Sequence, residues 1–181
     1  MNTPKASFDE SVPDPNLLWP ISWCGVTLLA HSELLRLVAY RDITRKPTIG
    51  WGQTENVTMG MTWTREQADR DLLRGLIKYT DAVKAMCKIT PNPNQLAALV
   101  VCEWNIGIAG LTTSTMIRKH NLGDFAGASA AFALWNKARV HGELVVSAEL
   151  VGRRADEAAL YSRLDDLMRQ PLPQTVEPPD A

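Results

Sequence analysis

The stretch SELLRLVAYRDITRKPTIGWGQT, Ser32 to Thr54, carries the decisive features of the fold. It places Glu33 before an apolar run, Asp42 at the end of that run, and a Thr-Ile-Gly-Trp-Gly segment after a short break. We interpret this pattern as a short strand pair joined by a loop at about Ile43–Pro47. Residues that face one another across two antiparallel strands have Cβ atoms about 5 Å apart. The pattern therefore predicts that Asp42 and Thr48 lie opposite one another on one face and can hold a water molecule between them.

Gly50 and Gly52 fall where the second strand should be strongest. Glycine weakens a strand, but it leaves the backbone open to close approach by a ligand. A lone hairpin is marginal in water and must pack against helices. A single β-rich patch between about Leu35 and Thr58 is therefore expected to line a cleft against a helical lobe.

The remaining segments show helical periodicity and capping signals. Thr64-Arg-Glu-Gln67 has the form of a capping box, and Leu96–Ile106 is apolar nearly all round, which is typical of a central buried helix. The sequence thus predicts a mainly α-helical, α+β fold with a small β-hairpin lobe, a larger helical lobe and a cleft between them. Helices are expected at about Ile21 to His31, Thr64 to Met86 (one helix, or two joined near Thr80), Leu96 to Ile106, Ser114 to His120, Asp124 to Asn136 and Glu149 to Met168.

The composition limits the class of protein. With 181 residues, 45% of them hydrophobic and 22% charged, the chain is long enough for one domain with a substantial core. A net charge of -1 and the lack of a basic stripe argue against nucleic acid as a partner. Cys24, Cys87 and Cys102 have no CxxC spacing, so they do not predict a metal site. We interpret them as buried thiols, against the alternative of one disulfide and one free thiol.

The N-terminal stretch Leu17–Ala30 is apolar, but it is shorter than the ~20 residues that span a bilayer and it contains Pro20. We therefore expect a buried helix here and no stable membrane insertion. The expected organisation is a leader over residues 1–20, one domain over 21–168 and a disordered tail over 169–181. Within the domain, the hairpin lobe covers about 35–60 and the helical lobe about 64–168.

Glu33 and Asp42 admit a chemical and a structural interpretation. If Glu33 lies at the end of the first helix among apolar side chains that include Trp104, burial raises the pKa of its carboxyl, while a solvated Asp42 stays ionised. One protonated and one ionised carboxyl are what acid/base hydrolysis of a glycosidic bond requires. Alternatively, Glu33 is a solvated residue at a helix end, Asp42 starts a turn and Thr48 serves β-propensity. Spacing alone leaves both interpretations open.

A family resemblance favours the chemical interpretation. The pattern E-x-L-R-L-x-A-Y-R-D-x5-T-I-G-W-G-x-T, Glu33 to Thr54, resembles the catalytic segment of the phage-type lysozymes, the muramidase endolysins. The resemblance covers about Leu29 to Tyr161, and separated motifs in the right order are more specific than any one motif. Three later segments are similar to that family in the same order: Gln95–Gly107, Ser114–Asn121 and Leu150–Glu157.

The resemblance implies a lysozyme-like catalytic domain that hydrolyses the β-1,4 bond between N-acetylmuramic acid and N-acetylglucosamine in peptidoglycan, with inversion. It makes Glu33 the general acid and gives Asp42 and Thr48 the task of positioning and activating a water on the other side of the sugar. It also implies that Arg154 pairs with Glu33 across the cleft and that Asn105 lies near the same carboxyl. No cofactor and no metal are expected, because two carboxyls and a water suffice.

Other positions have two interpretations or depart from the family pattern. Trp51 and Trp104 either stack on sugar rings or belong to the core. The resemblance further implies that Gln53 stands where the family commonly has histidine, and that Leu34 and Arg45 stand where it commonly has glycine. A glutamine at position 53 loses a supporting ion pair but can still form hydrogen bonds.

The expected function is that of a monomeric endolysin that cleaves peptidoglycan for host-cell lysis. A lytic transglycosylase and an inactive wall-binding protein on the same fold are the alternatives. A transglycosylase needs a catalytic Glu without a water-activating pair, so Asp42 and Thr48 argue against it. The expected location is the host cytoplasm until a holin opens the membrane, with signal-anchor export or a virion-associated enzyme as alternatives.

Overall fold

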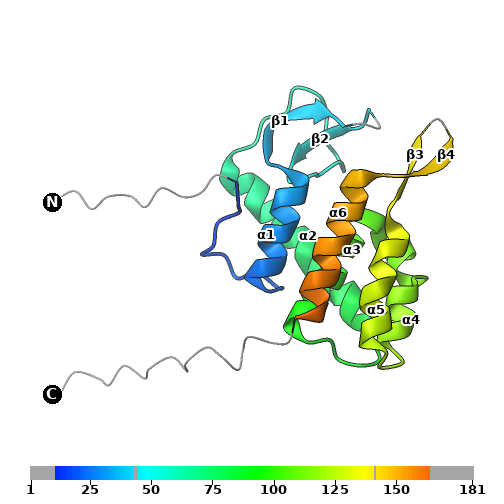
Figure 1. Cartoon of the computed structure of the whole chain (residues 1–181). Coiled ribbons are helices and arrows are strands. Elements are labelled where there is room, and N and C mark those ends of the chain that lie inside the picture. The colour runs from blue at the N-terminus through cyan, green and yellow to red at the C-terminus, as the bar shows by residue number, and fades with distance from the viewer. Residues whose placement is uncertain (1–10, 43–44, 141, 164–181) are drawn as a thin grey trace, which may run out of the picture.

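The computed structural model describes residues 11–42, 45–140 and 142–163. The predicted α+β class, mainly helical with a small β part, is confirmed (Figure 1). The tail expected over 169–181 and the last turns of the final predicted helix lie outside the described residues. The elements follow the order α1 (Trp23–Glu33), β1 (Arg36–Arg41), β2 (Pro47–Gly50), α2 (Arg65–Met86), α3 (Pro93–Thr112), α4 (Thr115–His120), α5 (Phe125–Ala131), the 3-10 helix η1 (Phe132–Trp135), β3 (Lys137–Val140), β4 (Glu143–Val146) and α6 (Ala148–Ser162).

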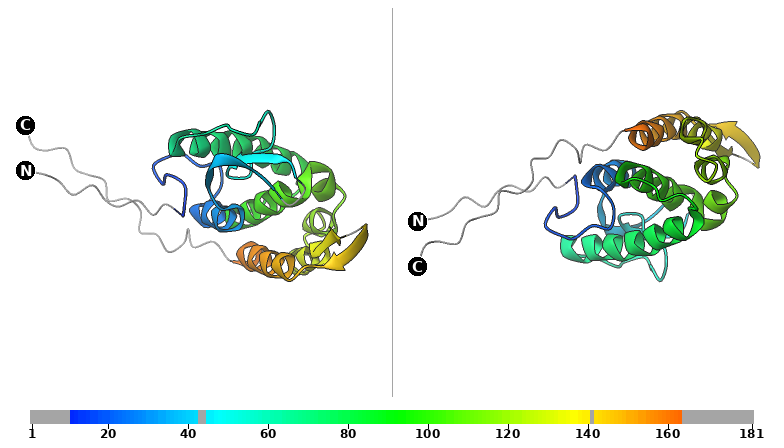
Figure 2. Two further views of the ribbon diagram at one scale, coloured as in Figure 1. Left: turned by 90° about the horizontal axis from the view of Figure 1, so that it is seen from above. Right: turned by 90° about the horizontal axis from the view of Figure 1, so that it is seen from below.

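Helix α3 forms the centre of the molecule. Every residue from Ala97 to Cys102 is 0% exposed, as expected for a helix that is apolar on all sides. Figure 2 shows α1 and α3 between α2 on one side and α6 on the other. Within the described part of the chain, α3 alone has the length and hydropathy of a membrane span. Its packing against α1, α2 and α6 accounts for that composition.

Side-chain caps fix where α2 and α3 begin. The Thr64 hydroxyl accepts a hydrogen bond from the Gln67 amide at 3.2 Å, and the Gln67 side chain accepts one from the Thr64 amide at 2.8 Å. Asn92 and Gln95 form the same reciprocal box at the start of α3. The predicted capping box is therefore confirmed. Helix α2 runs unbroken for 22 residues, so the alternative of two helices joined near Thr80 is wrong.

Helix α3 continues past its predicted end at Ile106. Gly107 has φ +77° and ψ 161°, which kinks the helix, and helical hydrogen bonding then resumes as far as Thr112. Only glycine adopts such a backbone conformation at little steric cost. The glycine therefore bends the helix without ending it.

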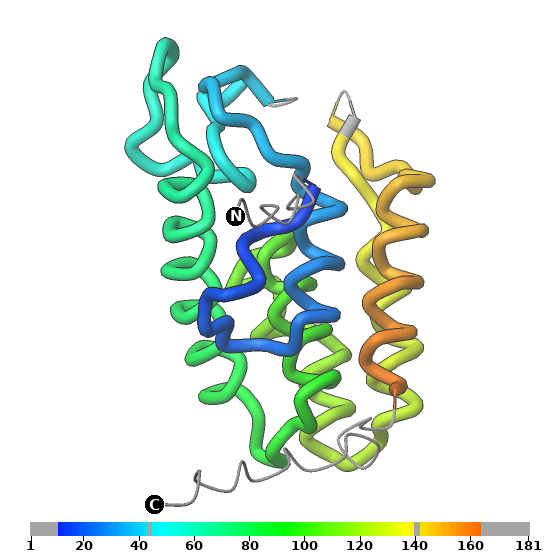
Figure 3. Tube along the Cα trace, turned by 90° about the vertical axis from the view of Figure 1, so that its left-hand side faces the viewer, coloured from blue at the N-terminus to red at the C-terminus, as the bar shows by residue number. Residues whose placement is uncertain are grey.

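Part of the expected leader packs against α2 before α1 begins (Figure 3). The Asp14 amide donates to Asp69 Oδ2 at 3.0 Å, and the Arg65 guanidinium donates to the carbonyl of Val12. The Trp19 indole N–H donates to the carbonyl of Asp14 at 3.0 Å. These contacts tie residues 12–19 to the start of α2.

The β1–β2 hairpin has a different register from the one predicted. Thr48 pairs with Tyr40 and not with Asp42, and Arg41 pairs with Pro47. The reason is a tight loop, in which the Asp42 amide donates to the carbonyl of Lys46 at 3.0 Å. Because side chains alternate along a strand, Asp42 still lies on the same face as Thr48, diagonally across the hairpin.

A second hairpin corrects the prediction of a single β-rich patch. Strands β3 and β4 pair in antiparallel fashion, with Lys137 opposite Val146 and Val140 opposite Glu143. The helix expected over Asp124 to Asn136 is shorter, because α5 ends at Ala131 and passes into η1. Strand β4 is exposed along its whole length, so no buried alternation in the sequence marks it as a strand.

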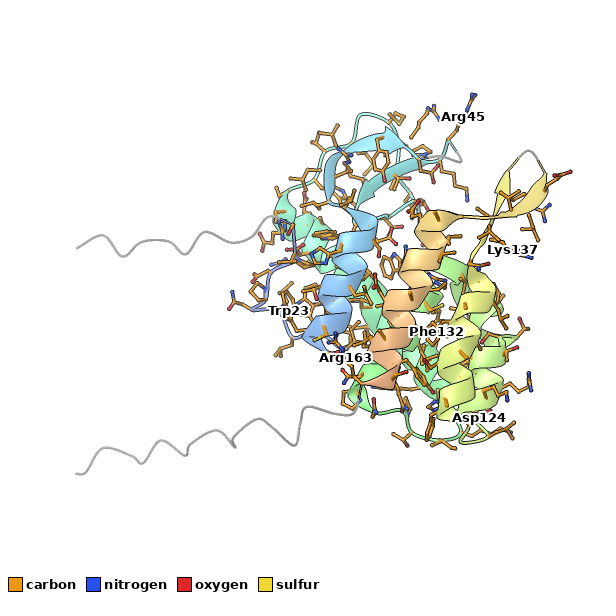
Figure 4. All side chains as sticks on the ribbon, in the orientation of Figure 1. Trp23, Arg45, Asp124, Phe132, Lys137 and Arg163 are labelled. Carbon is orange, nitrogen blue, oxygen red and sulfur yellow. The ribbon has the colours of Figure 1, made fainter. Side chains whose placement is uncertain are left out.

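The two hairpins rise at the same end of the molecule, where α1 ends and α6 begins (Figures 1 and 3). Figure 4 shows Arg45 at the outer end of the β1–β2 hairpin and Lys137 at the base of the β3–β4 hairpin. The residue that closes α1 is Glu33, and the residue that precedes α6 is Ser147. The helical core therefore brings Glu33 and the first turns of α6 to the end where both hairpins stand.

The three cysteines are free thiols, but they are not all buried as predicted. Cys102 is buried, Cys87 is partly buried and Cys24 is exposed. Burial raises the pKa of Cys87 to about 11 and that of Cys102 well above its usual value. Cys24 lies on the solvent side of α1, because the buried side of that helix is formed by Gly25, Val26, Leu29 and Ala30.

Backbone strain occurs at both positions where the resemblance expects glycine. Leu34, directly after α1, has φ +51°, and Arg45 has φ +65°. Such conformations cost non-glycine residues about 1–3 kcal/mol. The Leu34 side chain is 61% exposed, so its packing offsets little of that cost.

We expect Leu34→Gly to raise the free energy of unfolding by about 0.5–1 kcal/mol and Tm by about 2–4 °C, because relief of the steric strain exceeds the added entropy of the unfolded chain. Thermal unfolding followed by circular dichroism measures the change. Leu34→Ala is the matched control, since it shortens the side chain but keeps Cβ. An equal rise in Tm for both variants would assign the effect to the exposed side chain and not to the backbone.

Candidate active site

Glu33 occupies the last position of α1, and its carboxyl faces two lobes at once. Oε1 accepts a hydrogen bond from Arg153 Nη2 at 3.0 Å, and the side chain is 18% exposed. On the hairpin side, a Cβ atom at Gly52 would lie 2.8 Å from Glu33 Oε2, and Gly52 has φ +91°. The sequence predicted that glycines here admit a ligand; at Gly52 the missing side chain first admits the carboxyl of Glu33.

Burial governs the protonation of Glu33. Desolvation raises the pKa of its carboxyl, the charge and hydrogen bond of Arg153 lower it by less, and the nearby charge of Glu149 raises it further. The net pKa lies above the ordinary value of 4.5. A carboxyl in this position can keep its proton under conditions in which a solvated carboxyl has lost it.

The arginine that pairs with Glu33 is Arg153, so the predicted pairing by Arg154 is wrong. Arg154 is 1% exposed and points into the core, where Nη2 donates to Glu157 Oε1 at 2.7 Å and Nη1 contacts Cys102 Sγ at 3.4 Å. The side chain of Arg153 is only 9% exposed. Consecutive residues on a helix point about 100° apart, so the two arginines serve different neighbours.

The two arginines occupy different positions around α6. Its buried residues are Arg154, Glu157, Leu160 and Tyr161, which follow the spacing of one helical face. Arg154 belongs to this buried face, and Arg153 lies at its edge. The rotation of α6 against its neighbours therefore assigns the ion pair with Glu33 to Arg153.

Asp42 and Thr48 lie near the loop end of the β1–β2 hairpin. Thr48 is 3% exposed, and its hydroxyl donates to the carbonyl of Lys46 at 3.2 Å. Asp42 Oδ1 accepts a hydrogen bond from the Lys46 amide at 2.9 Å, so this carboxylate also closes the loop. The hairpin therefore holds a carboxylate and a hydroxyl on one face in a fixed local geometry.

Tyr40 is a site residue that the sequence analysis did not select. Burial raises the pKa of its phenol, as do the charges of Glu33 and Asp42, while Arg36 lowers it. Tyr40 is thus within electrostatic reach of both carboxyls and is the strand partner of Thr48. Tyr40 is connected to the site through its strand pairing with Thr48, and that pairing depends on where the hairpin loop closes.

Trp51 belongs to the core, which is one of the two interpretations that its sequence position allowed. It is 2% exposed, and its indole N–H donates to Asp69 Oδ1 at 2.8 Å. Arg65 lies over the ring, 5.5 Å from its centroid, and also pairs with Asp69 at 3.1 Å. This cluster fastens the hairpin lobe to the start of α2.

Trp104 and Gln53 lie close to Glu33 and to α2, respectively. Trp104 is partly buried against Tyr79, with ring centroids 5.3 Å apart, and its Nε1 lies 3.9 Å from the position that a Gly52 Cβ would take. The Gln53 side chain donates to Asp71 Oδ2 at 3.1 Å, so the amide does form a supporting hydrogen bond. Asn105 is exposed on α3.

The described residues offer no metal site. Among residues 11–42, 45–140 and 142–163, no group of three or more histidine, cysteine, aspartate or glutamate side chains gathers in a way that could hold an ion. The chemistry assembled around Glu33 consists of carboxyls, a guanidinium, a hydroxyl and a phenol. That set suits proton transfer to and from a polar substrate.

Known proteins place the chain in a family. The model of the family described as phage lysozyme matches residues 30–157. The chain belongs to the phage lysozyme family. It is accordingly a glycoside hydrolase that acts on peptidoglycan, and the endolysins among its relatives set it in the context of phage lysis of the host cell wall.

Relatives of this phage lysozyme cover most of its length. An endolysin of Acyrthosiphon pisum secondary endosymbiont phage 1 is 38% identical over 141 residues, covering 78% of this chain and 97% of the relative. A SAR-endolysin of Pseudomonas phage phiKMV is 36% identical over 133 residues, covering 74% and 81%. The solved structure of an endolysin from Escherichia coli O157:H7 phage FAHEc1 superposes with a TM-score of 0.75 at 38% identity, covering 78% of this chain and 92% of that one.

Glu103 is a second unusual carboxyl of this lysozyme, on α3. It is 0% exposed, and neither of its oxygens has a hydrogen-bond partner among the described residues. Burial raises the pKa of Glu103 to about 7.

Ionisation of Glu103 should make the fold less stable as pH rises. The unfolded chain releases this proton near the ordinary pKa and the folded chain near 7, so folding stability falls between those values and then stays level. We expect Glu103→Gln to raise stability at pH 8 by about 2–3 kcal/mol and to flatten the loss between pH 5 and 7.

Urea unfolding across that pH range measures this slope. Glu66→Gln, at an exposed position on α2 where Glu66 pairs with Arg70 at 2.7 Å, is the matched control and should leave the slope unchanged. An unchanged slope in Glu103→Gln would show that the Glu103 carboxyl reaches solvent or a partner.

Proposed function

We propose that this lysozyme hydrolyses the β-1,4 bond between N-acetylmuramic acid and N-acetylglucosamine with Glu33 as general acid. One observation carries the proposal: a largely buried carboxyl with a raised pKa lies against an arginine and directly under the hairpin backbone at Gly52. Burial holds a proton on Glu33 that can be given to the leaving oxygen of the sugar.

Arg153 supports the same step from the other side. When Glu33 gives its proton to the glycosidic oxygen, the carboxyl becomes an anion, and the guanidinium 3.0 Å away stabilises that anion. Arg153 lowers the pKa of Glu33 by less than burial raises it. Glu33 therefore stays protonated before the step, and Arg153 stabilises its conjugate base afterwards. The ion pair thus suits a group that changes charge during each turnover.

On the other face of the sugar, Asp42 and Thr48 would position the attacking water. The water oxygen bonds to the reacting carbon, its proton passes to the Asp42 carboxylate, and the bond to the leaving oxygen breaks as that oxygen takes the proton of Glu33. Attack opposite the leaving group inverts the configuration. The shared face of Asp42 and Thr48 on the hairpin supports this assignment.

The two alternative functions would give products different from those of hydrolysis. A lytic transglycosylase would release anhydro ends without adding water, and an inactive wall-binding protein would release nothing. Mass spectrometry of muropeptides released from purified peptidoglycan separates them, and we expect reducing-end muramic acid. The presence of Asp42 and Thr48 on one face favours hydrolysis.

We expect Glu33→Gln to lower the lysis rate of permeabilised Gram-negative cells by at least the ~10²-fold that a general acid supplies. The amide keeps the size of the side chain but has no acidic proton to donate. Glu66→Gln, at an exposed position on α2, is the matched control and should clear cells at the wild-type rate. A folded Glu33→Gln variant that lyses cells near that rate would remove Glu33 from the mechanism.

Asp42→Asn should also remove most activity while leaving wall binding intact, because the amide cannot accept the proton of the water. Pull-down on purified peptidoglycan measures binding beside the lysis assay. The wild-type rate should fall as pH rises through the raised pKa of Glu33, since the acid then loses its proton. Full activity in Asp42→Asn would move water activation to another group.

We also propose that the enzyme acts as a monomer and waits in the host cytoplasm until a holin opens the membrane. The SAR-endolysin among the relatives supports the alternative of signal-anchor export through the apolar stretch Leu17–Ala30. Expression without a holin, followed by fractionation, decides between them. We expect activity in the cytoplasmic fraction, and periplasmic activity would establish export.

A further inference from the structure

Behind the pair of Glu33 and Arg153 lies a buried charge cluster, which comprises Arg153, Arg154, Glu157 and Cys102. Glu157 Oε1 accepts hydrogen bonds from Arg154 Nη2 at 2.7 Å and from Arg153 Nε at 3.4 Å. The three charged side chains are 9% (Arg153), 1% (Arg154) and 0% (Glu157) exposed. One carboxylate is therefore shared by two guanidinium groups that the solvent barely reaches.

The charged side chains of this cluster carry a net positive charge. Two arginines face one glutamate, which leaves one positive charge, and Arg153 directs that charge to Glu33 Oε1. Helices α5 and η1 pack against α6 without a titratable side chain in either span. Glu149 on α6 and Tyr40 on β1 interact electrostatically with Glu33, and Cys102 lies on α3. Helix α1 also carries the exposed His31, and α3 carries the buried Glu103.

We propose that Glu157 is a positioning residue for the reaction, because it holds Arg153 against Glu33 and cancels the charge of Arg154. The inference rests on the proposed role of Glu33 as general acid. A guanidinium is planar and its donors have fixed directions, so a bond from Nε to Glu157 orients Nη2 toward Glu33. Glu157 thus fixes the orientation of Arg153 and the net charge next to Glu33.

The charge balance has a consequence for catalysis. Without the negative charge of Glu157, two cations would lie behind Glu33 and would favour its ionised form. Glu33 would then lose its proton at a lower pH, and the enzyme would lose its general acid over part of its working range. Without the positive charge of Arg154, the net charge behind Glu33 would be lower, and Glu33 would keep its proton to a higher pH.

Three variants test this charge balance: Glu157→Gln, Arg154→Met and the double variant. We expect the alkaline limb of the pH–rate profile to move down by about 1 pH unit in Glu157→Gln, at the low end of the effect of a neighbouring charge, and up by a similar amount in Arg154→Met. The double variant should return close to the wild-type limb. A merely structural role would lower rate or stability in both single variants without opposite shifts.

Carboxyl carbon NMR gives a second readout that does not depend on turnover. Titration of the Glu33 carboxyl, assigned by comparison with Glu33→Gln, should show the same opposite shifts. Thermal unfolding at each pH confirms that each variant is folded. The double variant guards against loss of fold, because replacing both members of a buried ion pair costs far less than removing one.

The outcomes separate this inference from the proposed function. If Glu33→Gln is inactive but neither single variant of the cluster moves the limb or the NMR titration, the role of Glu157 is overturned and the general acid stands. If Glu33→Gln retains activity, the proposed function itself fails. Opposite shifts in the two single variants establish Glu157 as the residue that sets the charge behind Glu33.

Discussion

The contact between Glu33 and Arg153 joins the end of the first helix to the last helix described, and the site depends on it. Helices α1 and α6 contact one another, and both pack on α3. The fully buried stretch of α3 provides that common support. A largely buried ion pair contributes little net stability, because desolvation of the charges offsets most of the attraction. Its value lies in placing a carboxyl and a cation at a defined separation.

The hairpin lobe is held to this site through α2. Trp51 and Gln53, on either side of Gly52, bond to Asp69 and Asp71 at the start of that helix. Gly52 can then approach the Glu33 carboxyl, because its backbone carries no side chain. Trp51 and Gln53, which resemble substrate contacts in the sequence, thus connect the hairpin lobe to α2. The result is a hairpin whose polar face is fixed relative to the carboxyl of α1.

Some features of the chain oppose stability. Leu34 and Arg45 adopt backbone conformations suited to glycine, and Glu103 buries a carboxyl without a partner. Leu34 lies next to Glu33, so the strain falls at the turn that carries the proposed acid into the site. Natural proteins commonly tolerate such costs, since selection acts mainly against falling below the stability that function needs. Glu103 is different, because nothing in the described structure links it to the reaction.

Much of the fold and part of the site followed from local patterns in the sequence. The capping box at Thr64, the all-round apolar character of α3 and the hairpin at Asp42 are encoded by neighbours in the chain, so they could be predicted. The β3–β4 hairpin could not, because its strands are short and exposed and leave no burial pattern. Residue types and their order were likewise sufficient to suggest Glu33, Asp42 and Thr48.

Only the tertiary structure decided which groups meet. The choice between Arg153 and Arg154 depends on the rotation of α6 against α1 and α3, and a rotation of one residue exchanges a core arginine for a site arginine. The pairing of Thr48 with Tyr40 depends on how tightly the loop closes at Lys46. The burial that raises the pKa of Glu33 comes from elements far apart in sequence. Local chemistry determined the candidates, and long-range packing determined their distances, partners and protonation, because those quantities arise only where distant segments touch.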